Sequence, residues 1–411
     1  MTTATLTAKP LREDAAVIGV IGVAHSISHF SQLLLAPLFP WLKTSFDVGY
    51  AELGALLTVF FVLSCAVQAL SGFVVDRHGP LPVLLGGLVA IGLAVLGLAA
   101  SQQYWQLMLF AALAGAGNGV FHPVDFTLMN RLVSGARLGH AYSAHGITGT
   151  VGWALAPALV VPLAMAYSWR VALLAAAAVV AAVLLVVWQQ RHLLALPTTR
   201  RAAHPGTPAA SASDPAMAFL RVPAVWVCFA FFFFYSAAMS GIQSFAPEAA
   251  RQLHGIAATM AAACVTVYMV GSGLGMVLGG FLAQDPKRCE RVIALGVGLA
   301  ALVALAMALM PVTQLLVPAL FGLMGFLVGI AGPSRDLIVK QAAPDNATGR
   351  VYGVVYSGLD TGMALAPLLY GALMDHERPA MVWLLIAATQ GVLILTAWQV
   401  RGARRTLPAP N

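Results

Sequence analysis

Long apolar segments, separated by short polar breaks, are the feature that most limits how this chain can fold. A helix needs about 20 apolar residues to cross the roughly 30 Å hydrocarbon core of a bilayer, and its backbone must satisfy its own hydrogen bonds there. The sequence therefore predicts an all-α polytopic membrane protein with twelve transmembrane helices. The expected spans are residues 15–42, 50–75, 82–100, 104–133, 140–166, 168–190, 219–247, 257–283, 290–310, 313–341, 348–374 and 379–400.

The composition supports this class. Only 9% of the 411 residues are charged and 60% are hydrophobic, with a mean hydropathy of +0.86. A soluble domain carries about 25% charged residues, so the soluble class is excluded. The net charge of +7 does not require a nucleic-acid partner, because most of the 22 Lys and Arg residues fall on one side of the expected membrane. The positive-inside rule puts that side, and both termini, in the cytoplasm.

A polar segment interrupts the apolar pattern between the sixth and seventh spans. It includes TTRRAAHPGTPAASASDPA, which is rich in Ala, Pro and Ser and has no apolar periodicity. Such a composition is typical of a flexible linker. We therefore expect a cytoplasmic tail at 1–14, an N-terminal six-helix bundle at 15–190, a cytoplasmic linker at 191–218, a C-terminal six-helix bundle at 219–400 and a cytoplasmic tail at 401–411.

The two expected bundles resemble each other in sequence. GVFHPVDFTLMNR around Pro123 recurs as GIAGPSRDLIVKQ around Pro333. GWALAPAL around Pro157 recurs, at the same spacing, as GMALAPLL around Pro367. Matches in the same order indicate a duplicated unit, and hence two pseudo-symmetric bundles. Transporters built from such repeats place the substrate path near the bilayer midplane.

The loop between the second and third spans carries a recognisable motif. It reads GFVVDRHGPLPVL and contains Gly72, Asp76, Arg77 and Gly79. This pattern resembles the signature of the major facilitator superfamily, although Pro80 stands where that family usually has a basic residue. The resemblance implies the major facilitator fold, with twelve helices in two six-helix bundles, and a gating role for the four motif residues.

Further short motifs are His29-Phe30, Pro37-Leu-Phe-Pro40, Gln68-Ala-Leu-Ser-Gly72 and Phe121-His122-Pro123. They resemble the fosmidomycin-resistance group of bacterial efflux proteins within that superfamily. The segment from Gly152 to Pro157 is also a diluted form of a motif associated with drug antiporters. The resemblance implies a multi-pass protein of the bacterial inner membrane that exports a small molecule.

Two acidic residues inside the spans are candidates for coupling and gating, because an unpaired ionisable residue is costly in a membrane. Asp360 lies about halfway along the eleventh span, and we expect it to carry the coupling proton or to contact substrate. A structural ion pair is the alternative. Asp125 lies nearer the cytoplasmic end of the fourth span. The resemblance implies that it pairs with Arg77 in the gate.

Histidines and one arginine in the spans are further candidates. His25 and His29 lie one turn apart on one helix face and suit a proton relay near neutral pH. His29 is also a candidate to bind an anionic group of the substrate, and hydrogen-bonded packing is the alternative for both. Arg335 suits binding of a carboxylate or phosphate, or a pair with the adjacent Asp336. Weaker candidates for substrate contact or transport chemistry, which suit helix packing equally well, are Asn118, His122, His145, Tyr235, Met239 and Gln243.

The sequence shows no nucleophile-and-base arrangement, metal cluster or phosphate loop, so we expect neither an enzyme nor a cofactor or metal site. Without an ATP-binding motif, the driving force would be an ion gradient, most simply protons. We expect a monomeric secondary active transporter that works by alternating access and exports a small drug-like, polar or anionic molecule in exchange for protons. Its partners would be that molecule, the proton and the lipid bilayer. Two alternatives remain open: uptake or exchange of an organic anion, and a non-transporting receptor or assembly factor with the same fold.

Overall fold

The computed structural model describes residues 10–196, 223–282, 289–342 and 348–405. Every regular element in these ranges is a helix, and they contain no strand. Eleven helical stretches among the described residues are long and apolar enough to cross a membrane. The remaining expected span, residues 348–374, corresponds to α14 (Thr348–Asp375). The predicted all-α membrane architecture is confirmed.

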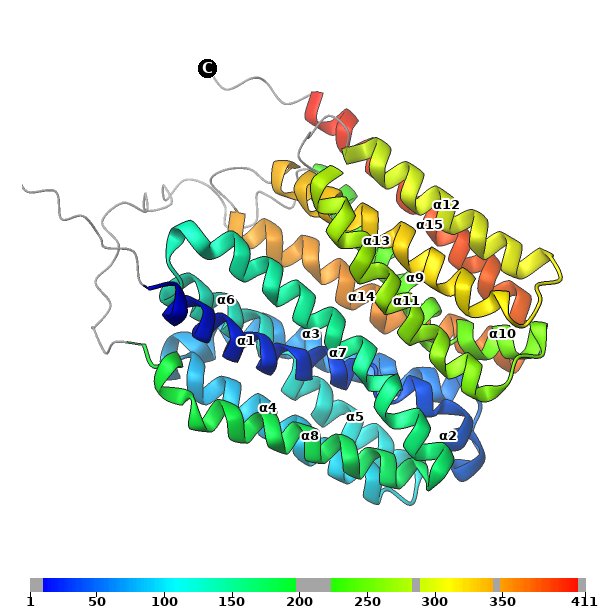
Figure 1. Cartoon of the computed structure of the whole chain (residues 1–411), viewed down its shortest axis with the longest axis horizontal. Coiled ribbons are helices and arrows are strands. Elements are labelled where there is room, and N and C mark those ends of the chain that lie inside the picture. The colour runs from blue at the N-terminus through cyan, green and yellow to red at the C-terminus, as the bar shows by residue number, and fades with distance from the viewer. Residues whose placement is uncertain (1–9, 197–222, 283–288, 343–347, 406–411) are drawn as a thin grey trace, which may run out of the picture. The chain divides into compact units, whose positions relative to one another are not determined.

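The chain divides into two compact units, whose helices can be followed by label in Figure 1. The first comprises residues 1–38 and 63–197, and the second comprises residues 39–62 and 198–411. Helix α3 (Tyr50–His78) contributes its N-terminal part to the second unit and its C-terminal part to the first. The other elements of the first unit are α1 (Leu11–Gln32), η1 (Ala36–Leu38), α4 (Pro80–Ala100), α5 (Tyr104–Asn118), α6 (Phe121–Leu132), η2 (Gly135–Arg137), α7 (Leu138–Ala166), α8 (Trp169–Gln189) and η3 (Arg191–Leu194). Those of the second unit are α2 (Phe39–Phe46), α9 (Pro223–Ser244), α10 (Ala246–His254), α11 (Ala258–Leu282), α12 (Cys289–Leu309), α13 (Leu316–Ala342), α14 and α15 (Pro379–Arg405).

Two expected spans are interrupted near a proline, and a third ends beside one. Pro37 lies between α1 and α2, Pro123 follows the break between α5 and α6, and Pro247 follows the break between α9 and α10. A proline cannot donate to the carbonyl four residues earlier, and its ring crowds that group. Pro123 and Pro247 therefore sit in the first turn of a new helix, where the missing N–H costs little. Hydropathy alone predicts continuous spans across Pro37 and Pro123, whereas the expected seventh span already ends at Pro247.

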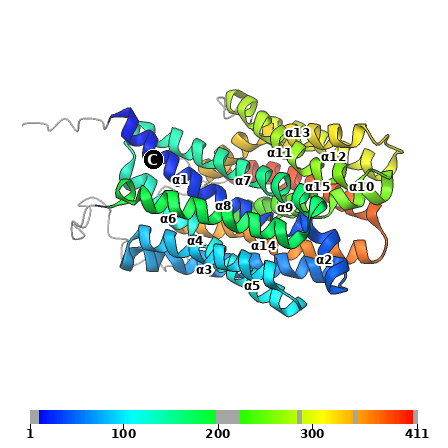
Figure 2. The same ribbon diagram turned by 60° about the horizontal axis from the view of Figure 1, so that its bottom comes forward.

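In the first unit, α1 packs along α7, and α4 packs against both α5 and α8 (Figure 2). Glycines allow α1 and α7 to approach closely, as small residues do in membrane bundles. A Cβ added at Gly152 would overlap the carbonyl oxygen of Ser26, and one added at Gly22 would lie 2.9 Å from Cγ2 of Thr148. This contact brings polar positions on α1 and α7 together.

In the second unit, α11 packs along α13, and α9 packs against α14 and α15. Gly275 on α11 and Gly325 on α13 each lie against a carbonyl oxygen of the other helix, so the glycine-rich stretch of α11 serves close packing. The N-terminus of α3 is capped within the same unit. The Asp375 carboxylate accepts hydrogen bonds from the backbone N–H groups of Tyr50 (2.6 Å) and Ala51 (2.7 Å), which have no partner within the helix.

Candidate functional site

Ionisable side chains of the first unit gather in one place inside the bundle. His25 and His29 lie one turn apart on α1, His122 and Asp125 lie about one turn apart on α6, and His145 lies on α7. Because α6 begins anew after the α5–α6 break, His122 and Asp125 occupy its first two turns. We call these five residues the His–Asp cluster. Its formation brings α1 against α6 and α7, which follow it by about 100 residues in the sequence.

One carboxylate joins two histidines of the cluster. Asp125 Oδ2 lies 2.9 Å from His25 Nδ1 and 3.1 Å from His145 Nε2. Asp125 is fully buried and His25 is 1% exposed, and the rings of His25 and His145 stack with their centroids 3.5 Å apart. The other oxygen, Asp125 Oδ1, is buried without a hydrogen-bond partner among the described residues. An ionised carboxylate only accepts hydrogen bonds, so the ionised form of Asp125 requires a proton on each of the two ring nitrogens that face it.

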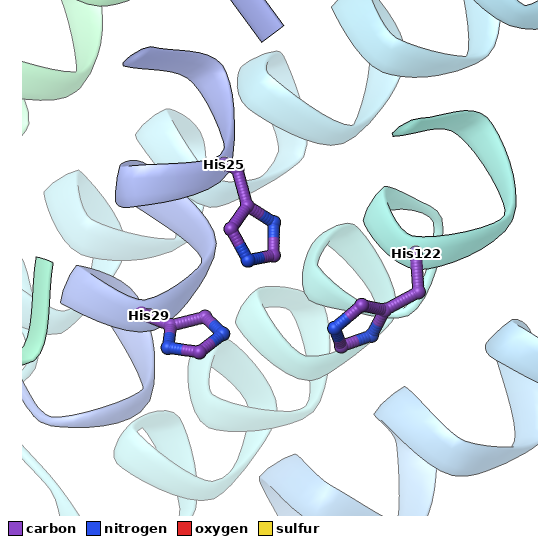
Figure 3. A group of neighbouring side chains, drawn as sticks. All are labelled: His25, His29 and His122. Atoms are coloured by element: carbon purple, nitrogen blue, oxygen red, sulfur yellow. The ribbon is translucent and has the colours of Figure 1, made fainter. Parts of the chain in front are cut away.

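His29 and His122 face His25 across a shared space (Figure 3). The ring centroid of His25 lies 4.7 Å from that of His29 and 5.4 Å from that of His122. His122 Nδ1 lies 3.0 Å from Gln68 Oε1 on α3, and the His29 ring packs against Trp153 with 4.1 Å between centroids. His29 and His122 are both half-buried. This side of the cluster is therefore its accessible side.

A second polar network centres on Asn118 at the end of α5. Its Oδ1 accepts hydrogen bonds from Ser28 Oγ (2.6 Å) and Gln32 Nε2 (3.3 Å), and its Nδ2 donates to Ser64 Oγ (2.8 Å). Gln32 Oε1 in turn accepts from Trp153 Nε1 at 3.1 Å. Asn118 is only 6% exposed. Its amide links α1, α3 and α5, which favours the packing alternative over substrate contact.

The expected gate differs from the observed arrangement in one respect. Arg77 is exposed, and it forms no ion pair with Asp125, although both residues lie in the described part of the chain. The expected Asp125–Arg77 pair is absent because Asp125 is buried and contacts the imidazoles of His25 and His145 instead. Gly72 is exposed, and Gly79 precedes α4 with φ of 82°, a conformation that favours glycine. The side chain of Asp76 lies outside the described residues, and the gating role stays a prediction.

The remaining candidates lie in the second unit. Tyr235 and Met239 line a small cavity together with residues of α11, α12, α13 and α15. Gln243, one turn further along α9, is 2% exposed, and its Nε2 has no hydrogen-bond partner among the described residues. Asp360 lies midway along α14 and is half-buried. Arg335 belongs to α13, but its side chain lies outside the described residues.

Two ion pairs near helix ends were not anticipated from the sequence. Asp14 on α1 binds Arg137 Nη1 at 2.7 Å and accepts the Ser134 backbone N–H at 3.2 Å. On α10, both Glu248 oxygens accept hydrogen bonds from Arg251 at 2.7 Å. These bonds raise the pKa of Arg251 above its usual value, so this guanidinium is charged throughout the neutral pH range.

The sequence pointed to the residues of the His–Asp cluster but not to the side chains that contact them. The i,i+4 spacing of His25 and His29 was a visible signal, whereas Gln68 and Trp153 carry no local signal of their contacts. The sequence also shows no metal-ligand spacing. In the structure, however, candidate ligand atoms of His25, His29 and His122 lie within 4.8 Å of one another, close enough to consider a shared ion.

Comparisons with known proteins identify related sequences. The Major Facilitator Superfamily profile matches residues 21–367 and 241–407. The fosmidomycin resistance protein of Escherichia coli (strain K12) is 30% identical over 159 residues, which cover 38% of this chain and 38% of that protein. The MFS-type transporter YfnC of Bacillus subtilis (strain 168) is 28% identical over 152 residues, which cover 36% of this chain and 37% of that protein. The aligned region therefore spans less than half the length of either relative.

A solved structure resembles the whole chain. The crystal structure of a bacterial homolog of the human lysosomal transporter Spinster, in an inward-facing and occupied conformation, matches with a TM-score of 0.76 over 98% of this chain and 100% of that chain. The sequence identity is 16%, so this likeness shows the fold alone. The profile match over most of the sequence shows that this chain belongs to the Major Facilitator Superfamily.

Proposed function

We propose that this protein is a secondary active transporter that exports a small polar or anionic molecule from the bacterial cytoplasm in exchange for protons. Membership of the superfamily supports transport. Similarity to a fosmidomycin resistance protein over 38% of the chain supports export of a drug-like molecule. The distribution of Lys and Arg favours an inner-membrane protein with both termini in the cytoplasm.

The His–Asp cluster is the observation that carries this proposal. A buried carboxylate with several imidazoles is costly inside a membrane-spanning bundle. Packing alone does not require it, because apolar side chains of similar volume would stabilise the bundle at least as well. The half-buried His29 and His122 offer ring nitrogens on the accessible side, and Trp153 adds an aromatic face. Such a surface suits a small molecule with polar oxygen atoms.

We assign proton coupling to Asp360 on α14. Its carboxyl group is half-buried within a span, where the charged form is costly. A substrate that donates a hydrogen bond to the carboxylate favours the ionised form. Binding of such a substrate would displace the proton, and release on the other side would allow protonation again. This competition is what antiport requires.

Proteoliposomes with an imposed pH gradient test the coupling residue. Fosmidomycin is the first probe, because it is the drug named for the E. coli relative. We expect the Asp360→Asn protein to exchange labelled for unlabelled probe but to lose acceleration by the gradient. The matched control is Asp47→Asn, which makes the same charge change at an exposed position between α2 and α3. An Asp360→Asn protein that is still driven fully by the gradient would refute the assignment.

Intact cells test the direction of transport. Cells that express the protein are expected to accumulate less fosmidomycin than cells carrying an empty vector, because export opposes entry. A panel of other small anionic antibiotics extends the test beyond this probe. Greater accumulation in the expressing cells would contradict export and support the uptake alternative.

A further inference from the structure

We propose that His25, His29 and His122 bind one divalent transition-metal ion of the Zn²⁺ or Ni²⁺ type in the first unit. Their candidate ligand atoms lie within 4.8 Å of one another, and Figure 3 shows each ring turning a nitrogen toward the space between them. Imidazole is a good ligand for these ions, whereas Mg²⁺ and Ca²⁺ prefer oxygen ligands. The site goes beyond the proposed export function and does not depend on Asp360.

Two hydrogen bonds give the ligands the required orientation. His25 Nδ1 faces Asp125 Oδ2 at 2.9 Å, and His122 Nδ1 faces Gln68 Oε1 at 3.0 Å. Both oxygens are acceptors, so each Nδ1 carries its ring's proton and each Nε2 keeps the lone pair that a metal needs. Histidine ligands almost always donate their other ring N–H to a carboxylate or carbonyl in this way. Both rings are therefore held as the tautomer that a metal ligand requires.

An ion requires only a modest adjustment of the rings. Nitrogens at about 2.0–2.1 Å from a tetrahedral Zn²⁺ lie about 3.3 Å apart. The spacing of up to 4.8 Å must therefore close by about 1.5 Å at most. His29 and His122 are half-buried and can turn toward His25, which Asp125 holds in place. Three protein ligands leave the fourth coordination position open, on the accessible side of the cluster.

The charge of the cluster also favours a cation. With neutral imidazoles, the His–Asp cluster carries the negative charge of Asp125, whose Oδ1 is buried without a partner among the described residues. A cation bound to His25 lies beside this carboxylate. A second set, namely His25, Asp125 and His145, meets the same distance limit. In that set the carboxylate and the two rings already bind one another, so we assign the ion to the three histidines.

Metal binding is measured on the full-length protein in detergent, purified without a polyhistidine tag because a tag binds the same ions. Isothermal titration is expected to give one Zn²⁺ per chain and no binding of Mg²⁺. Co²⁺ bound to the unmodified protein is expected to show the visible d–d bands of a tetrahedral site with nitrogen ligands. This spectrum needs no substitution, so the test does not depend on whether a variant folds.

Variants identify the ligands. We expect His29→Gln and His122→Gln each to weaken Zn²⁺ binding by more than about tenfold, and Gln68→Leu to weaken it by about 10- to 100-fold. The control His140→Gln changes an exposed histidine of α7 and is expected to leave the affinity unchanged.

Three outcomes would overturn the site: no stoichiometric Zn²⁺ binding by the unmodified protein, a Co²⁺ spectrum without tetrahedral bands, or binding that survives His29→Gln but is lost in His145→Gln. These equilibrium measurements involve no transport. Their failure would leave proton-coupled export standing, and failure of export would leave the metal site standing.

Discussion

Replacing Asp125 by asparagine tests whether one carboxylate holds two imidazoles inside the first unit. Asp125 is fully buried, and its Oδ2 lies 2.9 Å from His25 Nδ1 and 3.1 Å from His145 Nε2. Hydrogen bonds to a charged group are worth about 1.5–3 kcal/mol each, so the two together contribute about 3–6 kcal/mol. Asparagine keeps the shape and one acceptor oxygen but loses the charge. We therefore expect Asp125→Asn to lower the free energy of unfolding by about 2–5 kcal/mol.

Thermal unfolding of the protein in detergent measures this loss. Tryptophan fluorescence is a suitable signal, because Trp153 packs against His29 of the cluster with 4.1 Å between ring centroids. For a chain of 411 residues, 1 kcal/mol corresponds to about 1 °C, so the apparent Tm should fall by about 2–5 °C. The exposed control Asp47→Asn should stay within about 1 °C of the unmodified protein. Equal Tm values for Asp125→Asn and the control would refute the shared-carboxylate geometry.

Two further substitutions test the packing that positions the cluster and α3. Gly152→Val places a branched side chain against the carbonyl oxygen of Ser26 and should cost about 1–3 kcal/mol. The matched control is Gly146→Val, which lies on the same helix but has open space around its Cβ position. Equal Tm values for the two variants would contradict the close α1–α7 contact. Asp375→Ala removes the acceptor of the first N–H groups of α3 and should speed their hydrogen exchange. Exchange as slow as in the unmodified protein would show that this cap contributes nothing.

The helical architecture was largely predictable, because length and hydropathy are local properties of the sequence. The breaks before Pro123 and Pro247 could also have been inferred, since the missing N–H is a property of the residue itself. Hydropathy hides the first break because the residues on both sides of it remain largely apolar, whereas the chain after Pro247 is polar and includes Glu248 and Arg251. The break before Pro123 matters most, because it sets where His122 and Asp125 fall on α6.

The contacts of the site could not be predicted in the same way. His25 and Asp125 are 100 residues apart, and their contact depends on how α1, α6 and α7 pack. The resemblance instead implied that Asp125 pairs with Arg77, but Arg77 is exposed in the structure. Asn118 was a plausible substrate contact by its position, but only the packed helices show that Ser28, Gln32 and Ser64 use its hydrogen-bonding groups.

Proton movement during transport is the most direct test of proton-coupled export. Proteoliposomes that contain the protein and an internal pH-sensitive dye allow the flux of the probe drug and of protons to be followed together. We predict that the two move in opposite directions, and that Asp360→Asn abolishes the proton movement while Asp47→Asn preserves it. Full probe flux without proton movement, or with protons moving in the same direction as the probe, would contradict the proposal.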